Sequence, residues 1–526
     1  MMGFVQRRAA SAWFLIGLAA IIFASSYLSG VLSNKDSEMF SAPYRWRQAA
    51  LAALSMMVDP PARHYDIHRS LLDYTRHNGM PILGSEYDGP VSDPPPWLRL
   101  LRDGNKVNAL WAGALSVPVD VTLPPDVIRG NEVGYADFFL FAFRLFGPEV
   151  QSLYKFYFLL FAISITATVV AYRNVPTALF MLCVYLAAHL YAMDYQGRTL
   201  DLNVVFNSRG FSALGMLPGL HLAWACIRPR DGWRPRWPDI VQIMLLAFLI
   251  YCRTEVAWVA LALLSLCLPA LWRFGRVWGR GVWDGRVILA GVLVGALVVV
   301  RALPVVTLSK AYGTETGDHL FWHAVYTGLV SAHPTLGALY LQGDAEYSDS
   351  MGYNAVLRDL RARDDASSPI AFRRDGQIFI DVSRNFSEYD RLIGQITRRI
   401  ILEHPLECIG SMYYKARNQI DFFGYRHVYD LGRYIPALGF VVVASILLLV
   451  ARPLPRFELL RGLGVAFLFA LFSLMTPMLD STTTALGTLV SYVMMFFVVS
   501  VSLPIATVVL MVSKSRHSFG KKNRFS

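Results

Sequence analysis

Apolar stretches alternate with short polar connections along most of the chain, and two long polar segments interrupt this pattern. A helix needs roughly 20 apolar residues to cross the core of a bilayer. Ten runs near that length predict ten transmembrane helices, of which 211–227 and 239–252 are the shortest, at about 12–31, 152–172, 175–193, 211–227, 239–252, 254–272, 287–305, 434–451, 462–479 and 487–511. The pattern therefore predicts an all-α polytopic membrane protein.

The basic residues are concentrated in the short connections, and with ten helices all of these clusters fall on one side of the membrane. They include Arg7 with Arg8, the arginines between 228 and 236, and those between 273 and 286. An excess of positive charge marks the cytoplasmic side. Both termini are therefore expected in the cytoplasm, and the long polar segments 32–150 and 306–432 outside it. We expect a bacterial-type inner membrane.

Composition agrees with this topology and limits the partners. The chain is 55% hydrophobic and 17% charged, more apolar than a soluble protein of 526 residues can bury. Its net charge of +11 is mainly a topology signal, with attraction to anionic lipid second, so no nucleic-acid partner is expected. The expected organisation is a membrane module (1–305), the second outer segment (306–432), and C-terminal helices with a basic tail (433–526).

The first outer segment contains two apolar stretches too short to span a membrane, Ala49–Val58 and Gly134–Gly147. Helices of this kind lie at the membrane interface. Between them, the proline-rich stretch 85–97 predicts an ordered loop. In the second outer segment, the polar stretch 361–376 is the best candidate for a mobile flap.

This arrangement resembles the GT-C class of integral-membrane glycosyltransferases over roughly residues 1–310. The resemblance rests on the topology, on the acidic motif Asp36-Ser37-Glu38 just past the first helix, and on the phenylalanine-rich stretch 131–152. It implies transfer of a hexose or pentose from a polyprenyl-phosphate donor to a lipid, glycan or protein acceptor on the outer face. The motif of the class is often Asp-x-Asp, which implies a catalytic base at Asp36 and a second catalytic carboxylate at Glu38.

Three arginines lie at outer helix ends, against the charge rule: Arg209, Arg253 and Arg301. An arginine in that position needs a partner or a cavity, and its planar fork suits a phosphate. We therefore expect these residues to bind the donor phosphate. The alternative is a structural ion pair, for which Glu255 is available to Arg253.

The remaining candidates are polar and aromatic residues of the two outer segments. Glu86 and Asp88 are candidates for binding the acceptor, and Trp322, His323 and Tyr353 for stacking on or bonding a sugar ring. No histidine or carboxylate spacing specifies a metal, so a divalent cation stays open as a cofactor.

Three alternatives stay open beside the glycosyltransferase. One is a lipid or polysaccharide transporter or flippase, which is expected to carry paired polar groups deep in its helices. Another is an O-antigen-type polymerase or ligase, which shares the phosphate-binding arginines but does not need the acidic motif. The third is a non-catalytic scaffold.

Overall fold

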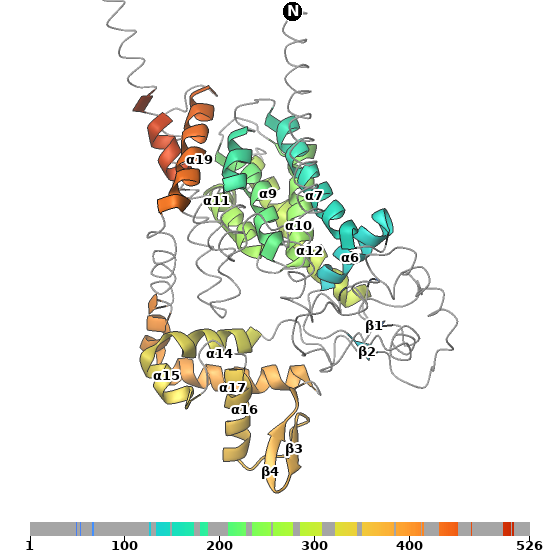
Figure 1. Cartoon of the computed structure of the whole chain (residues 1–526), viewed down its shortest axis with the longest axis vertical. Coiled ribbons are helices and arrows are strands. Elements are labelled where there is room, and N and C mark those ends of the chain that lie inside the picture. Colours follow the sequence, from blue (N-terminus) through green and yellow to red (C-terminus); the bar gives the residue numbers. More distant parts are fainter. Residues whose placement is uncertain are drawn as a thin grey trace, which may run out of the picture.

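The computed structural model shows a mostly helical protein (Figure 1). It describes residues 49, 53, 66–67, 126–127, 133–147, 150–172, 179–187, 209–227, 234–253, 256–276, 284–307, 321–343, 350–382, 385–411, 413–414, 431–450, 464, 498–506 and 508–509.

A helical bundle forms the upper part of the molecule in Figure 1. Its helices follow the predicted apolar runs closely, and they are α6 (Val133–Phe146), α7 (Val150–Tyr172), α9 (Arg209–Ile227), α10 (Trp237–Cys252), α11 (Ala257–Arg276), α12 (Gly285–Thr307) and α19 (Leu431–Val450). Helix α10 packs against α6, α7, α9 and α12 and so lies at the centre of the bundle.

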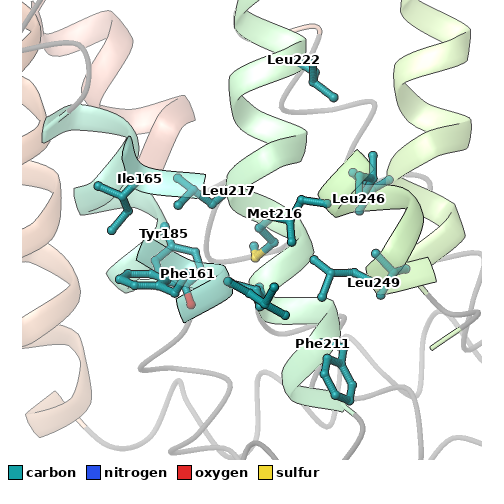
Figure 2. Packing of buried hydrophobic residues seen from close by; sticks show 14 of the residues in the cluster. Phe161, Ile165, Tyr185, Phe211, Met216, Leu217, Leu222, Leu246 and Leu249 are labelled. Atoms are coloured by element: carbon teal, nitrogen blue, oxygen red, sulfur yellow. The ribbon is translucent and has the colours of Figure 1, made fainter. Parts of the chain in front are cut away.

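The bundle core consists of large apolar side chains from α7, α9, α10 and residues 179–187. Figure 2 shows Phe161 of α7 beside Tyr185, with Met216 of α9 and Leu249 of α10 pointing into the same core. Helix α6 adds an aromatic layer, in which Phe138 contacts Phe211 edge-on with ring centroids 4.9 Å apart. These residues are buried, and their close packing contributes dispersion energy to the association of the helices.

Helix α6 confirms the short helix predicted at Gly134–Gly147, and it has two different faces. Phe138, Phe139 and Phe143 are buried in the bundle, whereas Phe141 and Leu145 are exposed. The segment 32–150, which was predicted to lie outside the membrane, therefore contains near its end a helix that is anchored on the bundle by one aromatic face.

A second module lies beyond the lower end of the bundle in Figure 1. It consists of α14 (Phe321–Ala332), α15 (Pro334–Tyr340), α16 (Ser350–Ala362), α17 (Phe386–Glu403) and the antiparallel strands β3 (Ala371–Arg374) and β4 (Gln377–Ile380). Its core, which includes Tyr326, Val356, Tyr389 and Ile393, is separate from the core of the bundle.

The β3–β4 hairpin occupies part of the stretch that the sequence analysis assigned to a mobile flap. Asp375 and Gly376 form its turn, both with positive φ, and Phe372 stacks on Phe379 across the strands. Asp-Gly between apolar residues is a strong hairpin signal. Neither this hairpin nor the short antiparallel pair β1 (Asp66–Ile67) and β2 (Asp126–Val127) was predicted from the sequence.

The apolar helices of the described residues differ in length, which decides whether they can cross a membrane. Within the described part of the chain, one helix is long and apolar enough to cross a membrane, at Lys155–Tyr172 in α7. Shorter apolar helices occur at Leu214–Cys226, Trp237–Cys252, Ala257–Trp272, Gly285–Val300 and Gly439–Leu449. The helices expected at 12–31 and 462–479 lie outside the described residues, apart from residue 464. The helical class is confirmed, and ten transmembrane helices stay a prediction.

Candidate functional site

The junction between α6 and α10 is held by contacts of three kinds. A Cβ on Gly134 would lie 2.2 Å from the carbonyl oxygen of Tyr251, so only glycine allows the two backbones to meet. The Cys252 thiol donates to the carbonyl oxygen of Gly134 at 3.3 Å. The Tyr251 hydroxyl donates to the Asp137 carboxylate at 2.6 Å. The last helix of the first outer segment thus fixes the end of α10.

Arg253 follows directly on this fixed helix end. Its backbone is extended and ends α10, with its N–H donating to Leu249 and its carbonyl accepting from Val256. The residue is only 6% exposed, and Asp137 is 4% exposed. A buried arginine and a buried carboxylate near one helix end form a polar site in an otherwise apolar bundle.

The predicted phosphate-binding arginines belong to helix ends that lie at the same end of the bundle. Arg209 begins α9, Arg253 follows α10, and Arg301 lies near the end of α12. Helix α9 runs antiparallel to α10, since His221 near the end of α9 pairs with Asp239 at the start of α10. Helix α11 runs back from the Arg253 end, and α12 returns to it after a short connection and packs against α10 and α11. The backbone therefore brings all three positions to the end where α6 is anchored.

A second polar site lies between α14, α16 and α17. Nδ1 of His323 is 2.5 Å from the hydroxyl of Tyr389, and the ring of Tyr353 lies 5.3 Å from each of the other two rings. A Cβ on Gly352 would lie 2.5 Å from Nδ1 of His323, so glycine makes room for the cluster. His323 and Tyr353, predicted as sugar-binding residues, are thus in contact.

Trp322, the third predicted residue of this group, stands beside the same cluster. The Arg398 guanidinium lies over the face of its indole in a cation–π contact, with the guanidinium carbon 4.7 Å from the ring centroid. Its backbone N–H donates to the Asp390 carboxylate of α17 at 3.0 Å, which caps the start of α14. Burial raises the pKa of Asp390 above its ordinary value. The hydrogen bonds from the backbone N–H groups of Trp322 and His323 offset only part of this shift.

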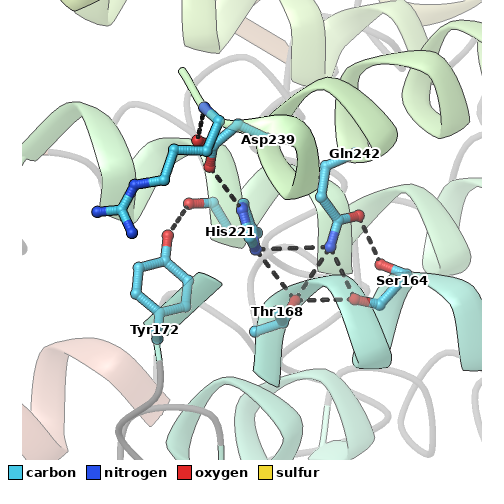
Figure 3. Close-up of polar contacts among 7 residues, drawn as sticks. Ser164, Thr168, Tyr172, His221, Asp239 and Gln242 are labelled. Atoms are coloured by element: carbon cyan, nitrogen blue, oxygen red, sulfur yellow. Dashed lines mark hydrogen bonds and ion pairs between the residues drawn. The ribbon is translucent and has the colours of Figure 1, made fainter. Parts of the chain in front are cut away.

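A third polar site lies at the opposite end of the bundle, between α7, α9 and α10 (Figure 3). Nε2 of His221 is 2.9 Å from the Asp239 carboxylate, and Nδ1 is 3.1 Å from the Thr168 hydroxyl. Gln242 donates to Thr168 and accepts from the Ser164 hydroxyl at 2.8 Å. All five side chains are buried. This network joins three helices through polar contacts.

Neither this network nor the role of Asp137 was predicted from the sequence. Both had a sequence signal, because a single acid or histidine within an apolar run is expensive in a membrane and marks a buried site. Asp137 lies within the phenylalanine-rich stretch, and His221 lies within the run 211–227. Asp239 also had a second signal, since it follows Trp237-Pro238 in the first turn of α10, where an acid stabilises the helix start.

Four predicted residues lie outside the described residues: Asp36, Glu38, Glu86 and Asp88. Among the residues that are described, no group of three or more histidine, cysteine or acidic side chains could hold a metal ion. Comparisons of the chain with known protein families, with curated proteins and with solved structures find no match.

Proposed function

We propose that the bundle is embedded in a membrane by about ten transmembrane helices. The support is an inverted polarity: large apolar side chains face outward, among them Leu268, Trp272, Val298 and Val299, while the network around His221 lies inside. A soluble protein places polar groups outward and seldom exposes so much apolar surface together. A lipid environment accounts for both observations.

We further propose that the protein is a glycosyltransferase that acts on the outer face of the inner membrane. It takes its sugar from a polyprenyl-phosphate donor. The observation that carries this proposal is the buried Arg253 at the α6–α10 junction, at the bundle end where Arg209 and Arg301 are also found. A guanidinium in a site of low polarity binds a phosphate strongly and stabilises the charge that it gains as a leaving group. Asp137 and Tyr251 fix the helix end that carries it.

The chemistry assigned to the remaining residues follows from the resemblance to the GT-C class. An acceptor hydroxyl oxygen bonds to the anomeric carbon of the sugar as the bond from that carbon to the phosphate oxygen breaks. The acceptor proton passes to the carboxylate of Asp36, and the electron pair leaves with the phosphate. Glu38 orients the acceptor or a divalent cation, Glu86 and Asp88 contact the acceptor, and the Trp322–His323–Tyr353 group binds the sugar.

The test is transfer of radiolabelled sugar from polyprenyl-phosphate hexoses and pentoses by the purified protein in lipid nanodiscs. Asp36→Asn and Glu38→Gln should abolish transfer. Arg253→Gln should weaken donor use by about ten- to a hundredfold, the effect of losing a hydrogen bond to a charged group. Arg286→Gln, at the opposite end of the bundle and paired with Asp284, is the matched control. Full activity of the Asp36, Glu38 and Arg253 variants would refute the assignment.

A lipid or polysaccharide transporter is the second candidate, and the His221–Asp239 network favours it. Transporters carry buried ionisable groups between helices, and this network joins α7, α9 and α10. Movement of a fluorescent polyprenyl-phosphate lipid between the leaflets of proteoliposomes, lost in His221→Ala and kept in Arg253→Gln, would select the transporter. Sugar transfer without lipid movement would select the enzyme.

A further inference from the structure

The helical segment that follows α17 has one buried face and, on the opposite side, an exposed apolar face. Residues 405–411 and 413–414 are helical, after a break in the helix at His404. One face packs inward, where Cys408 and Ser411 are buried, and the Ser411 hydroxyl donates to the carbonyl oxygen of Leu329 in α14 at 2.7 Å. This contact fixes the segment to the module and so determines which face is turned outward.

The outward face carries Leu406, Ile409 and Tyr413, which are 77%, 65% and 65% exposed. Their spacing of three and four residues places them on one side of the helix. Leu402, in the last turn of α17, is 81% exposed. A row of exposed apolar side chains on one side of a helix indicates a surface for another partner. This surface is therefore expected to be covered in the working protein.

We propose that Leu406, Ile409 and Tyr413, the docking stripe, insert into the outer leaflet of the membrane and hold the α14–α17 module against it. The inference rests on the proposed membrane embedding of the bundle. The docking stripe would contact lipid. The α14–α17 module would then be held at the membrane surface and would not move freely in solution.

The chain itself argues for lipid as the occupant. The segment is separated from α19 only by residues 415–430, and α19 carries the exposed apolar residues Val442, Val443 and Ile446. This short connection keeps the docking stripe close to a helix whose exterior is apolar. Leucine and isoleucine with a tyrosine at one end is also the composition of helices that lie at a membrane interface.

The distribution of charge beside the docking stripe is consistent with this orientation. Glu403 is exposed and Glu407 partly exposed, and by helical spacing Glu407 lies to the side of Leu406 and Ile409. Glu407 can therefore stay in water when the stripe enters the leaflet. The single line of apolar residues is narrow, as expected for a helix that lies in the interface without crossing it.

The test uses the full chain in lipid nanodiscs with one spin label at a time, on Leu406→Cys and, independently, Ile409→Cys. The five native cysteines are buried, so the unsubstituted chain gives the background labelling. Collisions of the label with dissolved oxygen and with a water-soluble nickel chelate are measured. Lipid contact is expected to make oxygen collisions exceed chelate collisions at 406 and 409, with the ratio inverted at Glu403→Cys and at Arg374→Cys, whose parent side chain in the hairpin is exposed.

Val442→Cys on α19 separates the inference from its premise. If the label at 442 is in water, the membrane embedding itself fails. If 442 is in lipid but 406 and 409 are in water, the docking stripe is refuted alone. Low collision with both reagents at 406 and 409 would also refute it, since a protein surface then covers the stripe. Dipolar broadening between labels would identify that surface as a second copy of the chain.

Discussion

Hydrogen bonds to buried carboxylates help to hold the residues on which the proposed donor site depends. The hydroxyl of Tyr251 reaches a carboxylate that is 4% exposed, at 2.6 Å. Water does not replace a lost hydrogen-bond donor at so buried a carboxylate. The Tyr251 hydroxyl therefore affects both the stability of the protein and the position of the end of α10. Asp390, in the second module, plays the same role for the start of α14.

Removing the Tyr251 hydroxyl should destabilise the protein measurably. Tyr251→Phe deprives the buried Asp137 of a donor, and we expect a loss of about 1–3 kcal/mol in the free energy of unfolding. Denaturant titration in mixed micelles measures it. Tyr413→Phe, at an exposed tyrosine, is the control and should change little. Equal effects of the two substitutions would mean that the bond to Asp137 contributes nothing.

Two substitutions of Asp390 should separate its capping role from its charge. Asp390→Ala removes the acceptor of the Trp322 N–H and should cost about 1 kcal/mol, whereas Asp390→Asn keeps an acceptor oxygen. Unfolding of the two variants, followed by circular dichroism, measures the difference. If both lose the same stability, the cap is not the reason.

The charge of Asp390 should appear as a pH dependence. Burial raises the pKa of this carboxyl above its ordinary value. The group therefore favours the folded state most below its unfolded pKa, and this contribution is lost as pH rises through the folded pKa. Asparagine does not titrate. The stability of Asp390→Asn relative to the unsubstituted chain should therefore increase as pH rises from the unfolded pKa of the carboxyl through its folded pKa. A relative stability that is flat or falls with pH would contradict the direction of the shift.

At the scale of elements, close approach between helices decides where the site residues stand. Helix α6 reaches the backbone of α10 only because residue 134 is glycine. Helix α6 therefore positions the end of α10 by direct packing. This contact lies next to Arg253.

Gly134→Ala should separate α6 from α10. The added Cβ would meet backbone atoms of Tyr251, which cannot rotate away, so we expect a loss of at least about 1–3 kcal/mol together with reduced donor use. Gly291→Ala in α12 has open space around its Cβ and should stabilise that helix by about 0.5–1 kcal/mol. Thermal unfolding in detergent compares them. A Gly134→Ala variant as stable as Gly291→Ala would disprove the close contact.

At the scale of the whole molecule, two separate cores predict two units of stability. One core unites α6–α12 with residues of α19 and 498–506, and the other unites α14–α17 with the β3–β4 hairpin. Opening of one core need not open the other, because local unfolding follows contiguous packing.

Truncating Tyr389, at the centre of the second core, should therefore destabilise the α14–α17 module without destabilising the bundle. Tyr389 is fully buried, and Tyr389→Ala should cost roughly 3–5 kcal/mol, by analogy with other large aromatic truncations. Hydrogen exchange followed by mass spectrometry should show lost protection in α14, α16 and α17, with α9 and α10 unchanged. Loss of protection spreading through α9 and α10 would mean that the two cores unfold as one.

The apolar runs by themselves determined most of the helices. Helices α7, α9, α10, α11, α12 and α19 follow runs predicted from the sequence to within a few residues, because a long apolar stretch can satisfy its backbone only as a helix in an apolar environment. The arginines at helix ends were also visible, since the charge pattern is local. The β3–β4 hairpin was missed although its Asp-Gly turn was present in the sequence.

Only the tertiary structure decided which distant residues meet. The Tyr251–Asp137 bond, the His221–Asp239 pair and the His323–Tyr389 contact join positions on different helices. No periodicity along one helix encodes such pairs, because they depend on how helices are rotated and offset against one another. The sequence thus determined the elements and the side of the membrane expected for each connection. Packing determined the polar sites between them.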